Sequence, residues 1–306
     1  MDRLEAMSIL LSVAQAGSLS GAARQLHKPL ATVSRKIADL EKHLGARLLI
    51  RTTRRMTLTD SGQAYVNACR RILDEVQQAE QAVAGEFSEP RGELVITAPV
   101  VFGRICVLPV LTQFLQAYEQ INARLLLADR VVHLMDDHVD VAVRIGQLPD
   151  SSLTATPIGQ VRQTICASPD YLAREGVPDR PAELATFPCI GIDNASGIME
   201  WRFDGGRKPI TVAPNYRLSV STVEAARDAA IAGLGLARLL SYQAARPCRA
   251  GELQVVLSGF EPPPLPVSLV YSVQSAREFM PIKLRAFLDF ARPKLSAQLG
   301  ALALPA

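Results

Sequence analysis

The sequence predicts a two-part protein, in which an N-terminal all-α winged helix-turn-helix and a long linker helix precede a C-terminal α/β domain. Three observations predict this fold class. Residues 1–60 carry ten Lys and Arg against five Asp and Glu, a net charge of +5. Apolar residues recur at helical spacing through most of residues 2–84. From residue 93 onward, apolar strands alternate with helices, which favours mostly parallel sheets.

The composition is typical of a globular protein with two or three cores: the 306-residue chain is 48% hydrophobic and 21% charged. It lacks an uncharged apolar run of about 18 residues, so we expect no membrane-spanning helix. The charged start, Met1-Asp2-Arg3-Leu4-Glu5, does not resemble a signal peptide, so we expect a cytoplasmic protein. Since the whole chain carries +3, the part after residue 60 carries −2. A basic N-terminal part on a mildly acidic remainder suggests a module that binds a polyanion.

The cysteines and histidines predict neither a disulfide framework nor a metal site. No C-x-x-C pair occurs, so free thiols in a reducing cytoplasm are the favoured interpretation, and a redox-sensing thiol is the alternative. The cysteines are Cys69, Cys106, Cys166, Cys189 and Cys248. His133 and His138 are separated by carboxylates, so we expect no zinc site and no cofactor.

Three helices open the chain. The first spans residues 2–16 and is ended by Gly17, and Ser18 to Ser20 offer capping hydroxyls to a short second helix over residues 21–26. The third follows the turn at residues 27–29 and ends before Gly45. Its inner stripe is Val33, Ile37, Leu40 and Leu44.

The outward face of the third helix is centred on Arg35, with small and basic residues beside it. Alone, this pattern is also typical of an ordinary amphipathic surface helix. Because a short helix and a tight turn precede it in a basic segment, we interpret it as the recognition helix of a helix-turn-helix.

Residues 46–50 and 56–58 predict the two strands of a wing, whose basic turn reaches phosphates or a minor groove; a solvated surface turn is the alternative. Thr59 then caps a helix running to about residue 84. That helix carries a heptad seam, which predicts self-association, with core packing in one chain as the alternative. The seam consists of Tyr65, Cys69, Ile72, Val76, Ala79 and Val83. Gly85, Pro90 and Gly92 mark a linker.

The C-terminal part alternates strands and helices. Expected strands are residues 94–98, 123–127, 139–145, 164–167 and 267–271, and expected helices are residues 108–118, 131–137, 221–231 and 279–290. This predicts a DNA-binding domain over residues 1–58, a linker helix over 59–89 and an effector-binding domain over 90–306. Subdomain I comprises about 90–165 and 267–296, and subdomain II about 166–266. A ligand would bind between them, at strand carboxyl ends and helix N-termini.

Over nearly its full length the chain resembles the LysR-type transcriptional regulators. In the N-terminal part the resemblance rests on the following motifs: Ala22-Ala23-Arg24-Gln25-Leu26, Val33-Ser34-Arg35-Lys36-Ile37, Leu40-Glu41-x-x-Leu44-Gly45, Arg47-Leu48-Leu49, Arg51-Thr52-Thr53-Arg54-Arg55 and Leu58-Thr59-x-x-Gly62. In the C-terminal part it rests on Asp140-Val141-Ala142-Val143-Arg144-Ile145-Gly146, Ser151-Ser152-Leu153 and Ala232-Gly233-Leu234-Gly235-Leu236.

The resemblance implies an effector domain shaped like a type II periplasmic binding protein and a linker helix that pairs between subunits. It also implies a homodimer that assembles into a homotetramer, binds double-stranded promoter DNA and responds to a small organic effector. Activators of this family commonly contact RNA polymerase as well.

One departure concerns the turn before the recognition helix. The family commonly has Gly-x-Ser-Gln-Pro-Ala, and here residues 27–32 read His-Lys-Pro-Leu-Ala-Thr. Leu30 replaces a base-reading Gln, so we expect hydrogen-bonded readout from Thr32, Ser34 and Arg35, with Leu30 against a thymine methyl group. The full predicted DNA-binding set is Lys28, Leu30, Thr32, Ser34, Arg35, Lys36, Arg51, Arg54 and Arg55.

The predicted effector site lies around the loop after the first strand of the C-terminal part. It comprises Thr97, Pro99, Val100, Val101, Asp129, Arg144, Gly146, Ser221 and Thr222. Amides at the helix start after Thr222 suit an anionic ligand group, and we expect an aromatic or other small organic acid. Alternatively, Asp129 caps a helix and Arg144 pairs with a carboxylate.

Other functions fit the sequence less well. An enzyme is not expected, because no Ser-His-Asp arrangement, phosphate loop or metal constellation appears, and Gly233-Leu234-Gly235 lacks the third glycine of a dinucleotide motif. A solute-binding protein would not need the basic N-terminal part. A ligand-independent DNA-binding repressor or architectural protein is the remaining alternative, against which the large α/β part argues.

Overall fold

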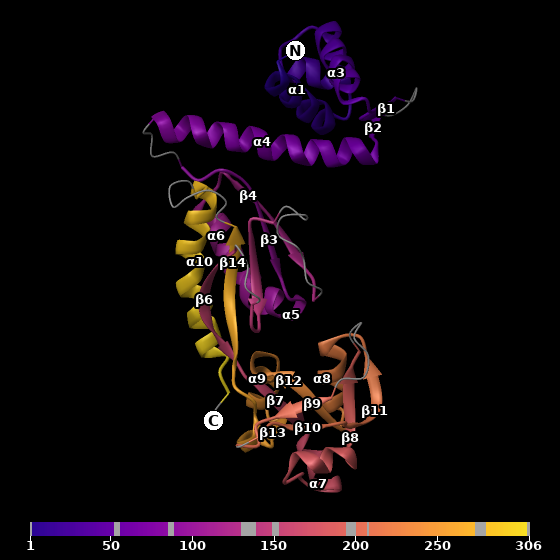
Figure 1. Cartoon of the computed structure of the whole chain (residues 1–306), viewed down its shortest axis with the longest axis vertical. Helices are drawn as coiled ribbons and strands as arrows, with labels where there is room; N and C mark the ends of the chain where they lie inside the picture. Colours follow the sequence, from indigo (N-terminus) through magenta and orange to yellow (C-terminus); the bar gives the residue numbers. More distant parts are fainter. Residues whose placement is uncertain are drawn as a thin grey trace. The chain divides into compact units, whose positions relative to one another are not determined.

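The computed structural model describes residues 2–51, 56–84, 89–129, 139–148, 153–193, 200–206, 208–272 and 280–304. The chain forms two compact units, Met1–Ser88 and Glu89–Ala306. We refer to them as the N-terminal unit and the C-terminal unit (Figure 1).

The N-terminal unit is a helical domain with a two-stranded sheet. Its elements are α1 (Arg3–Ala16), α2 (Leu19–Gln25), α3 (Leu30–Leu44), β1 (Leu49–Arg51), β2 (Met56–Leu58) and α4 (Asp60–Ala84). The α2 helix begins two residues earlier than predicted, because the Ser18 hydroxyl caps it by accepting a hydrogen bond from the Gly21 amide at 3.0 Å. Gly45 ends α3 in the left-handed conformation at φ 66°, as its position predicted.

The core of the N-terminal unit contains three residues of the predicted stripe of α3, Val33, Ile37 and Leu40, whereas the prediction is wrong for Leu44, which is 37% exposed next to Gly45 at the end of the helix. Val33 and Ile37 are 0% exposed, and α1 packs against them through Leu10 and neighbouring residues. The α4 helix adds Val66 and Cys69 to the same core. The first half of α4 therefore belongs to the fold of this unit.

The wing differs in its strand boundaries from the prediction. β1 spans residues 49–51 rather than 46–50, and it pairs antiparallel with β2, with Leu49 opposite Leu58. The Glu41 carboxylate accepts hydrogen bonds from the amides of Leu48 at 2.8 Å and Leu49 at 3.1 Å, which holds the preceding segment against α3. Arg54, Arg55 and the Arg51 side chain lie outside the described residues.

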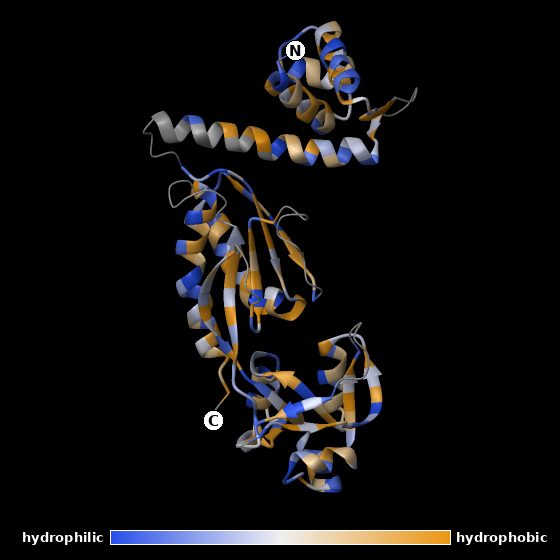
Figure 2. Ribbon diagram, viewed as in Figure 1, coloured by the Kyte–Doolittle hydropathy of each residue, from blue (hydrophilic) through white to orange (hydrophobic). Residues whose placement is uncertain are grey.

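The C-terminal unit contains two sheets with helices against them (Figure 1). The strand order of the first sheet is β4 (Ile121–Leu127), β3 (Gly92–Ala98), β5 (Val141–Ile145), β14 (Leu265–Ser272) and β6 (Leu153–Val161). Packed with it are α5 (Val100–Phe102), the π-helical η1 (Gly103–Val107), α6 (Leu108–Ala117) and α10 (Ile282–Ala301). In Figure 2 the α10 ribbon alternates between hydrophobic and hydrophilic residues, as expected for a helix with one buried face.

The strand order of the second sheet is β11 (Asn215–Val220), β8 (Pro188–Ile192), β12 (Leu236–Leu240), β7 (Gln163–Ala167) and β13 (Gln254–Val256). Its helices are α7 (Pro169–Glu175), η2 (Pro181–Ala185), α8 (Val223–Ile231), α9 (Ser241–Arg249) and η3 (Ser258–Phe260). A separate hairpin consists of β9 (Trp201–Phe203) and β10 (Ile210–Val212).

The expectation of mostly parallel sheets is wrong for part of each sheet. β3 is parallel to β4 and β5, and β8 is parallel to β11 and β12, but β14 and β7 each pair with antiparallel neighbours. The reason is that the chain crosses between the sheets twice. It passes from β6 to β7 at Arg162 and returns from β13 to β14, and these four crossing strands make the antiparallel pairs. Residues 163–165 consequently lie in the second sheet, and residues 265–266 in the first.

The last helix also differs from the prediction, since α10 continues to Ala301 instead of ending near residue 290. Leu295 and Leu299 are buried, and their packing extends the helix past Pro293. The helix predicted over residues 131–137 lies outside the described residues.

Among the residues that the structure describes, one continuous helical stretch, Val100–Ala117, is long and apolar enough to cross a membrane by length and composition, and α1 with α2 passes only as a pair bent by 115°. Phe102, Cys106 and Phe114 within that stretch are 0% exposed in the core of the C-terminal unit. Core packing accounts for its apolar character.

Candidate functional site

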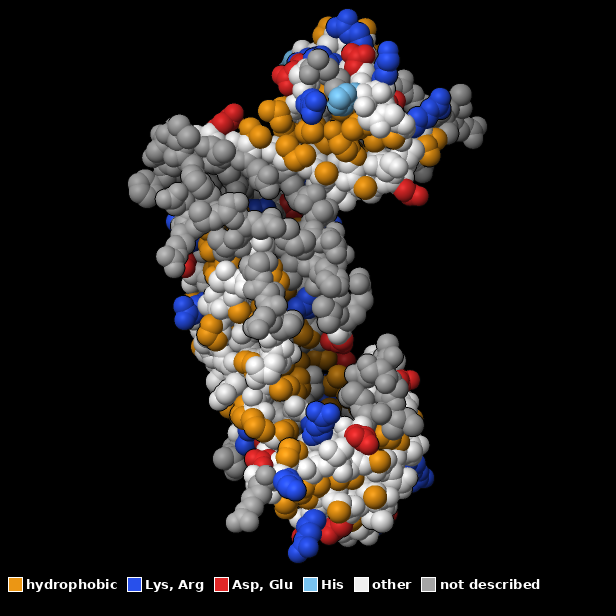
Figure 3. All heavy atoms as spheres, viewed as in Figure 1, with side chains coloured by type: hydrophobic (Ala, Val, Ile, Leu, Met, Phe, Trp, Pro, Cys, Tyr) orange, Lys and Arg blue, Asp and Glu red, His pale blue; other side chains and the backbone are white. Residues whose placement is uncertain are grey.

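The outer face of α3 has the composition predicted for a recognition helix. Arg35 is exposed on the side opposite the buried stripe, and Thr32 and Ser34 lie beside it. Leu30, the first residue of α3, is 50% exposed. In Figure 3, Lys and Arg side chains lie on the surface of the N-terminal unit, with Asp, Glu and His side chains among them. This face can therefore offer hydrogen-bond donors, one apolar contact and positive charge to a groove.

Two of the predicted phosphate contacts are bound to a carboxylate within the N-terminal unit. The Nζ atoms of Lys28 and Lys36 each lie 2.5 Å from an oxygen of Glu5. Hydrogen bonds from Lys28 and Lys36 lower the pKa of Glu5 to about 2. Glu5 was not among the predicted site residues, because 23 and 31 positions separate it from the lysines and only the folded arrangement of α1, the turn at residues 27–29 and α3 brings them together.

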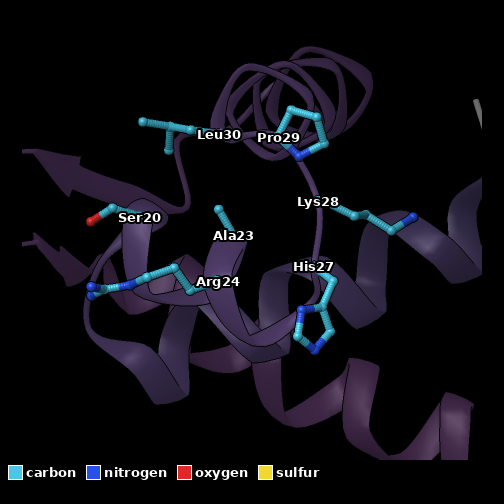
Figure 4. A pocket seen from close by; sticks show the side chains of 7 residues that line it. All are labelled: Ser20, Ala23, Arg24, His27, Lys28, Pro29 and Leu30. Carbon is cyan, nitrogen blue, oxygen red and sulfur yellow. The ribbon is translucent and has the colours of Figure 1, made fainter.

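A concave surface lies at the turn between α2 and α3, and we call it the turn hollow. It is lined by Ser20, Ala23, Arg24, His27, Lys28, Pro29 and Leu30. In Figure 4, Ser20 and Arg24 lie on one side of it, His27 and Lys28 on the other, and Ala23 lies between them. Within the described part of the chain, neither Arg24 nor Arg35 has an ion-pair partner. Arg24, which is outside the predicted DNA-binding set, is a further candidate contact.

The wing is fixed to α4 by a small set of hydrogen bonds. The Thr59 hydroxyl donates to the Arg47 carbonyl and accepts from the Gly62 amide, both at 2.8 Å. A Cβ atom at Gly62 would overlap the Leu48 carbonyl oxygen, so this close approach requires glycine. The motif Leu58-Thr59-x-x-Gly62 thus positions β1 and β2 against the start of α4.

The residues of the predicted dimerisation seam on α4 differ in burial. Cys69 is 0% exposed and Tyr65 packs against the same core, so packing within one chain accounts for these two residues. Ile72 is 37% exposed. The side chains of Ala79 and Val83 lie outside the described residues. In Figure 3, hydrophobic side chains are exposed over the described part of α4.

In the C-terminal unit, the structure brings two predicted effector residues together. The Val100 amide at the start of α5 donates a hydrogen bond to the Asp129 carboxylate at 3.0 Å. Pro99 is the N-cap residue of α5. Thr97 is 0% exposed with its hydroxyl bonded to the Leu126 carbonyl at 3.0 Å, and Val101 is 3% exposed in the core. Thr97 and Val101 therefore hold the loop at Pro99 and Val100 in place by packing in the interior.

The other predicted effector residues lie at strand and helix ends. Arg144 near the carboxyl end of β5 is half-buried, and burial lowers its pKa. Gly146 follows β5 with a positive φ of 115°. Ser221 and Thr222 are exposed before α8, where the Thr222 hydroxyl caps the helix by accepting from the Ala225 amide at 3.3 Å.

Two contacts that the sequence analysis missed join the two halves of the C-terminal unit. Arg104 of η1 forms an ion pair with Glu224 in the first turn of α8, at 3.2 Å. The Phe102 and Tyr242 rings meet edge to face, with centroids 5.3 Å apart. Burial raises the pKa of Tyr242. No local pattern identifies such pairs, because each joins segments more than 100 residues apart.

The cysteine thiols are mostly buried. Burial raises the pKa of Cys69 to about 11 and those of Cys106 and Cys189 to about 12. The Cys166 and Cys248 thiols share a hydrogen bond that raises the pKa of Cys166 and lowers that of Cys248. Among the described residues, no group of three or more His, Cys, Asp or Glu side chains could hold a metal ion.

These features define a helix-turn-helix transcriptional regulator with a small-molecule-binding α/β domain. Residues 4–63 match the family of bacterial regulatory helix-turn-helix proteins of the lysR type, and residues 87–296 match the LysR substrate binding domain. The chain belongs to the LysR family of transcriptional regulators, as the resemblance predicted.

Several transcriptional regulators are similar to this protein over nearly the whole chain. An HTH-type transcriptional repressor of Pseudomonas aeruginosa is 32% identical over 292 residues, which cover 95% of this chain and 91% of that protein. The solved structure of CrgA, a LysR-type regulator from Neisseria meningitidis, matches with a TM-score of 0.59 and 30% identity, covering 97% of this chain and 98% of that chain. The full-length structure of AphB, a virulence activator of Vibrio cholerae, matches with a TM-score of 0.59 and 26% identity, covering 94% of this chain and 98% of that chain. The predicted two-part fold is thereby confirmed.

Proposed function

We propose that the outward face of α3 reads promoter DNA, with Thr32, Ser34 and Arg35 contacting base edges. Phosphate contacts come from Lys28, Lys36 and the wing residues Arg51, Arg54 and Arg55. The observation that carries this proposal is the exposed guanidinium of Arg35, which has no ion-pair partner in the described residues and lies opposite the buried stripe. Such a guanidinium can donate two hydrogen bonds to a guanine.

Gel-shift titrations on the DNA upstream of the protein's own gene test this proposal. Replacing Arg35 by Ala should weaken specific binding by about 1–3 kcal/mol and relax base preference at one position. Arg35→Lys is the matched control for charge, since it keeps the cation and loses the bidentate geometry. If Arg35→Ala bound DNA with wild-type affinity and selectivity, Arg35 would not contact the bases, and the proposal would be wrong for this residue.

We propose further that a small organic acid binds in the C-terminal unit, between the α5 loop and the start of α8. The Arg104 guanidinium of η1 reaches this region through its ion pair with Glu224, Arg144 lies near the carboxyl end of β5, and the first turn of α8 supplies backbone amides. Because the Val100 amide is bonded to Asp129 and the Ala225 amide to Thr222, the remaining first-turn amides of α8 and the Arg104 guanidinium are the favoured partners of the carboxylate. An acid would compete with Glu224 for Arg104.

Thermal-shift measurements on the full chain can test the effector class. Each small aromatic or aliphatic acid is compared with its uncharged amide at the same concentration. We expect a rise in Tm with some acids and none with the matching amides, since binding to the folded state raises stability. Shifts from amides alone would contradict an acid effector.

We also propose that the chain is a homodimer through the far half of α4, which assembles into a homotetramer. Ile72 is the exposed apolar residue that supports this surface, with Val76, Ala79 and Val83 continuing the seam. Sedimentation should show a smaller species for Ile72→Glu. The same substitution at Val177, which is 52% exposed in a loop, is the control and should leave the mass unchanged. Identical masses for both variants would contradict the seam.

As a DNA-bound regulator the protein acts in the cytoplasm, where promoter DNA is present. In an activating role, its further partner is RNA polymerase.

A further inference from the structure

A third connection joins the two sheets of the C-terminal unit. The chain crosses from the first sheet to the second at Arg162 and returns through residues 257–264. The α10 helix packs on the first sheet, and the residues that follow it reach the second sheet (Figure 1). Leu304 is 8% exposed in a core cluster of the second sheet, and Leu302 packs against the cores of both sheets. We call residues 302–304 the strap, because they fasten α10 to the second sheet.

The side chain of Arg162, on the first crossing, contacts both of the other connections. Its Nε atom lies 3.4 Å from Oε2 of Glu261 on the second crossing, and its Nη2 atom donates to the Leu304 carbonyl at 3.3 Å. The backbone of Arg162 is fixed by Ser241 at the start of α9. The Arg162 amide donates to the Ser241 hydroxyl at 3.1 Å, and the Ser241 amide donates to the Arg162 carbonyl at 2.8 Å. One residue therefore joins the two crossings and the strap.

A second arginine binds the strap from α9. The Nη2 atom of Arg249 donates hydrogen bonds to the Ala301 carbonyl and, at 3.2 Å, to the Ala303 carbonyl. The last carbonyls of a helix lack partners within that helix, so this guanidinium satisfies groups that the end of α10 leaves free. The strap is thus held by burial of Leu304 and by hydrogen bonds from two arginines that lie outside α10.

The Glu261 carboxylate makes this arrangement resist rotation. Its side chain is 9% exposed, burial raises its pKa, and among the described residues its Oε1 atom has no hydrogen-bond partner. The positive charge of Arg162 opposes this rise in pKa, so the carboxylate depends on that cation. A buried charge that loses its partner is strongly destabilised. The ion pair therefore opposes any rotation that separates the two crossings.

We propose that the strap fixes the orientation of the two sheets relative to each other. While residues 302–304 are bound, Arg162 and Arg249 hold both crossings and α10 together. Once the strap leaves, two crossings remain, and the sheets rotate about them as about a hinge. Since the proposed effector site lies between the sheets, release of the strap changes how widely that site opens. This last consequence rests on the proposed function, whereas the strap itself does not.

Pulsed electron paramagnetic resonance on the full chain measures the orientation directly. Nitroxide labels are attached to p-acetylphenylalanine at Gln116 of α6 and at Val177 after α7, two exposed positions, one on each side of the crossings. This chemistry avoids the native cysteines, and an excess of unlabelled chain removes distances between subunits. The wild type should give one distance, and a chain shortened to end at Ala301 should give at least one further distance. Leu288→Ala is the control, since it removes a leucine of similar burial, 9% exposed, from the first-sheet core and should keep the wild-type distance.

Hydrogen exchange detects release of the strap even when the released form is rare. The Leu302 amide is bonded to the Gln298 carbonyl, and the Ser241 amide reports the first crossing. Leu304→Ala should speed exchange at Leu302 about 25-fold or more, as expected for the loss of a buried leucine side chain, and should also speed exchange at Ser241. Leu288→Ala should speed neither.

A pair of arginine variants on α9 tests the hydrogen bonds. Arg249→Gln should speed exchange at Leu302 by about two- to tenfold, because it removes bonds to the strap carbonyls. Arg246→Gln makes the same change in charge at an exposed position one turn earlier and should leave the rate unchanged. Equal rates in the two variants would show that Arg249 does not hold the strap.

The outcomes separate the strap from the proposed function. An unchanged distance distribution in the shortened chain would overturn the strap, and so would the same new distance in Leu288→Ala, since lost stability alone would then produce it. If the shortened chain does not fold, a wild-type exchange rate at Ser241 in Leu304→Ala overturns the strap instead. None of these measurements uses DNA or an acid, so the DNA-binding and effector proposals stand or fall in their own assays.

Discussion

Replacing Glu5 by Gln should increase the dependence of DNA binding on salt. In the free protein the Glu5 carboxylate is bonded to both Lys28 and Lys36, so it offsets positive charge beside the recognition helix. The substitution keeps the shape of the side chain and removes its charge. In the wild type each phosphate that contacts Lys28 or Lys36 shares the lysine with Glu5; without this carboxylate the phosphates alone neutralise both ammonium groups, and affinity at low salt should rise.

The magnitude follows from the number of lysines released. Each phosphate contact contributes about 0.9 to the slope of log affinity against log salt concentration on B-DNA. Two lysines therefore add up to about 1.8 to the slope. Asp39→Asn is the matched control, because Asp39 is exposed on α3 and the variant has the same change in net charge without a lysine partner in the described residues. Fluorescence anisotropy titrations from low to high salt measure both slopes.

Equal slopes for the Glu5→Gln and Asp39→Asn proteins would refute the reasoning, since they would mean that Glu5 does not withhold the lysines. A pH series gives an independent check. The pKa of Glu5 falls from 4.5 to about 2 on folding, so its stabilising contribution is present above pH 4.5 and is lost as the pH falls towards 2. The wild-type Tm should exceed that of Glu5→Gln at neutral pH, and the difference should vanish in this acid range.

Three further predictions concern the fold and the thiols. His27 has a positive φ of 50°, which costs an L-residue about 1–2 kcal/mol, so His27→Gly should stabilise the N-terminal unit by up to about 1 kcal/mol in a chemical denaturation series; a lower stability would contradict the assigned turn. Gly62→Ala should destabilise by about 1–3 kcal/mol or more because its methyl overlaps a wing carbonyl oxygen, whereas Gly300→Ala, with open space at its Cβ, should be neutral or stabilising, and melts that shift alike would argue against the overlap. Iodoacetamide at about pH 8 should label Cys248 first, since a hydrogen bond with Cys166 lowers its pKa; mass spectrometry that finds another cysteine labelled first would contradict this order.

The local features of the N-terminal unit could be predicted because each depends on residues close in sequence. The stripe Val33, Ile37, Leu40 has helical spacing, and all three side chains are at most 1% exposed. Gly45 and Thr59 occupy the cap positions that their residue types favour. A helix and its two ends depend on interactions between residues a few positions apart. A pattern in the sequence shows such interactions directly.

Contacts between distant segments could not be predicted in the same way. Glu5 resembles any acidic residue in the first turn of a helix, and nothing near it indicates Lys28 or Lys36 as partners. The same holds for Arg104 with Glu224, and for β14, which returns to pair antiparallel with β5 and β6. β6 was not predicted although it has nine residues and pairs along the full length of β14, because its burial does not alternate and Pro157 and Gly159 interrupt its apolar pattern.

The packing of its first turns into the core of the N-terminal unit makes α4 a rigid lever. Val66 and Cys69 fix the recognition helix and the wing to its first turns, so the DNA-binding surface cannot swivel independently of the helix. A helix of 25 residues is about 37 Å long. If two chains meet along its far half, the distance and the relative rotation of their DNA-reading surfaces become properties of helix length. One residue inserted in the middle of α4 would advance the lever by about 1.5 Å and turn it by about 100°, moving the two surfaces off a common face of the duplex.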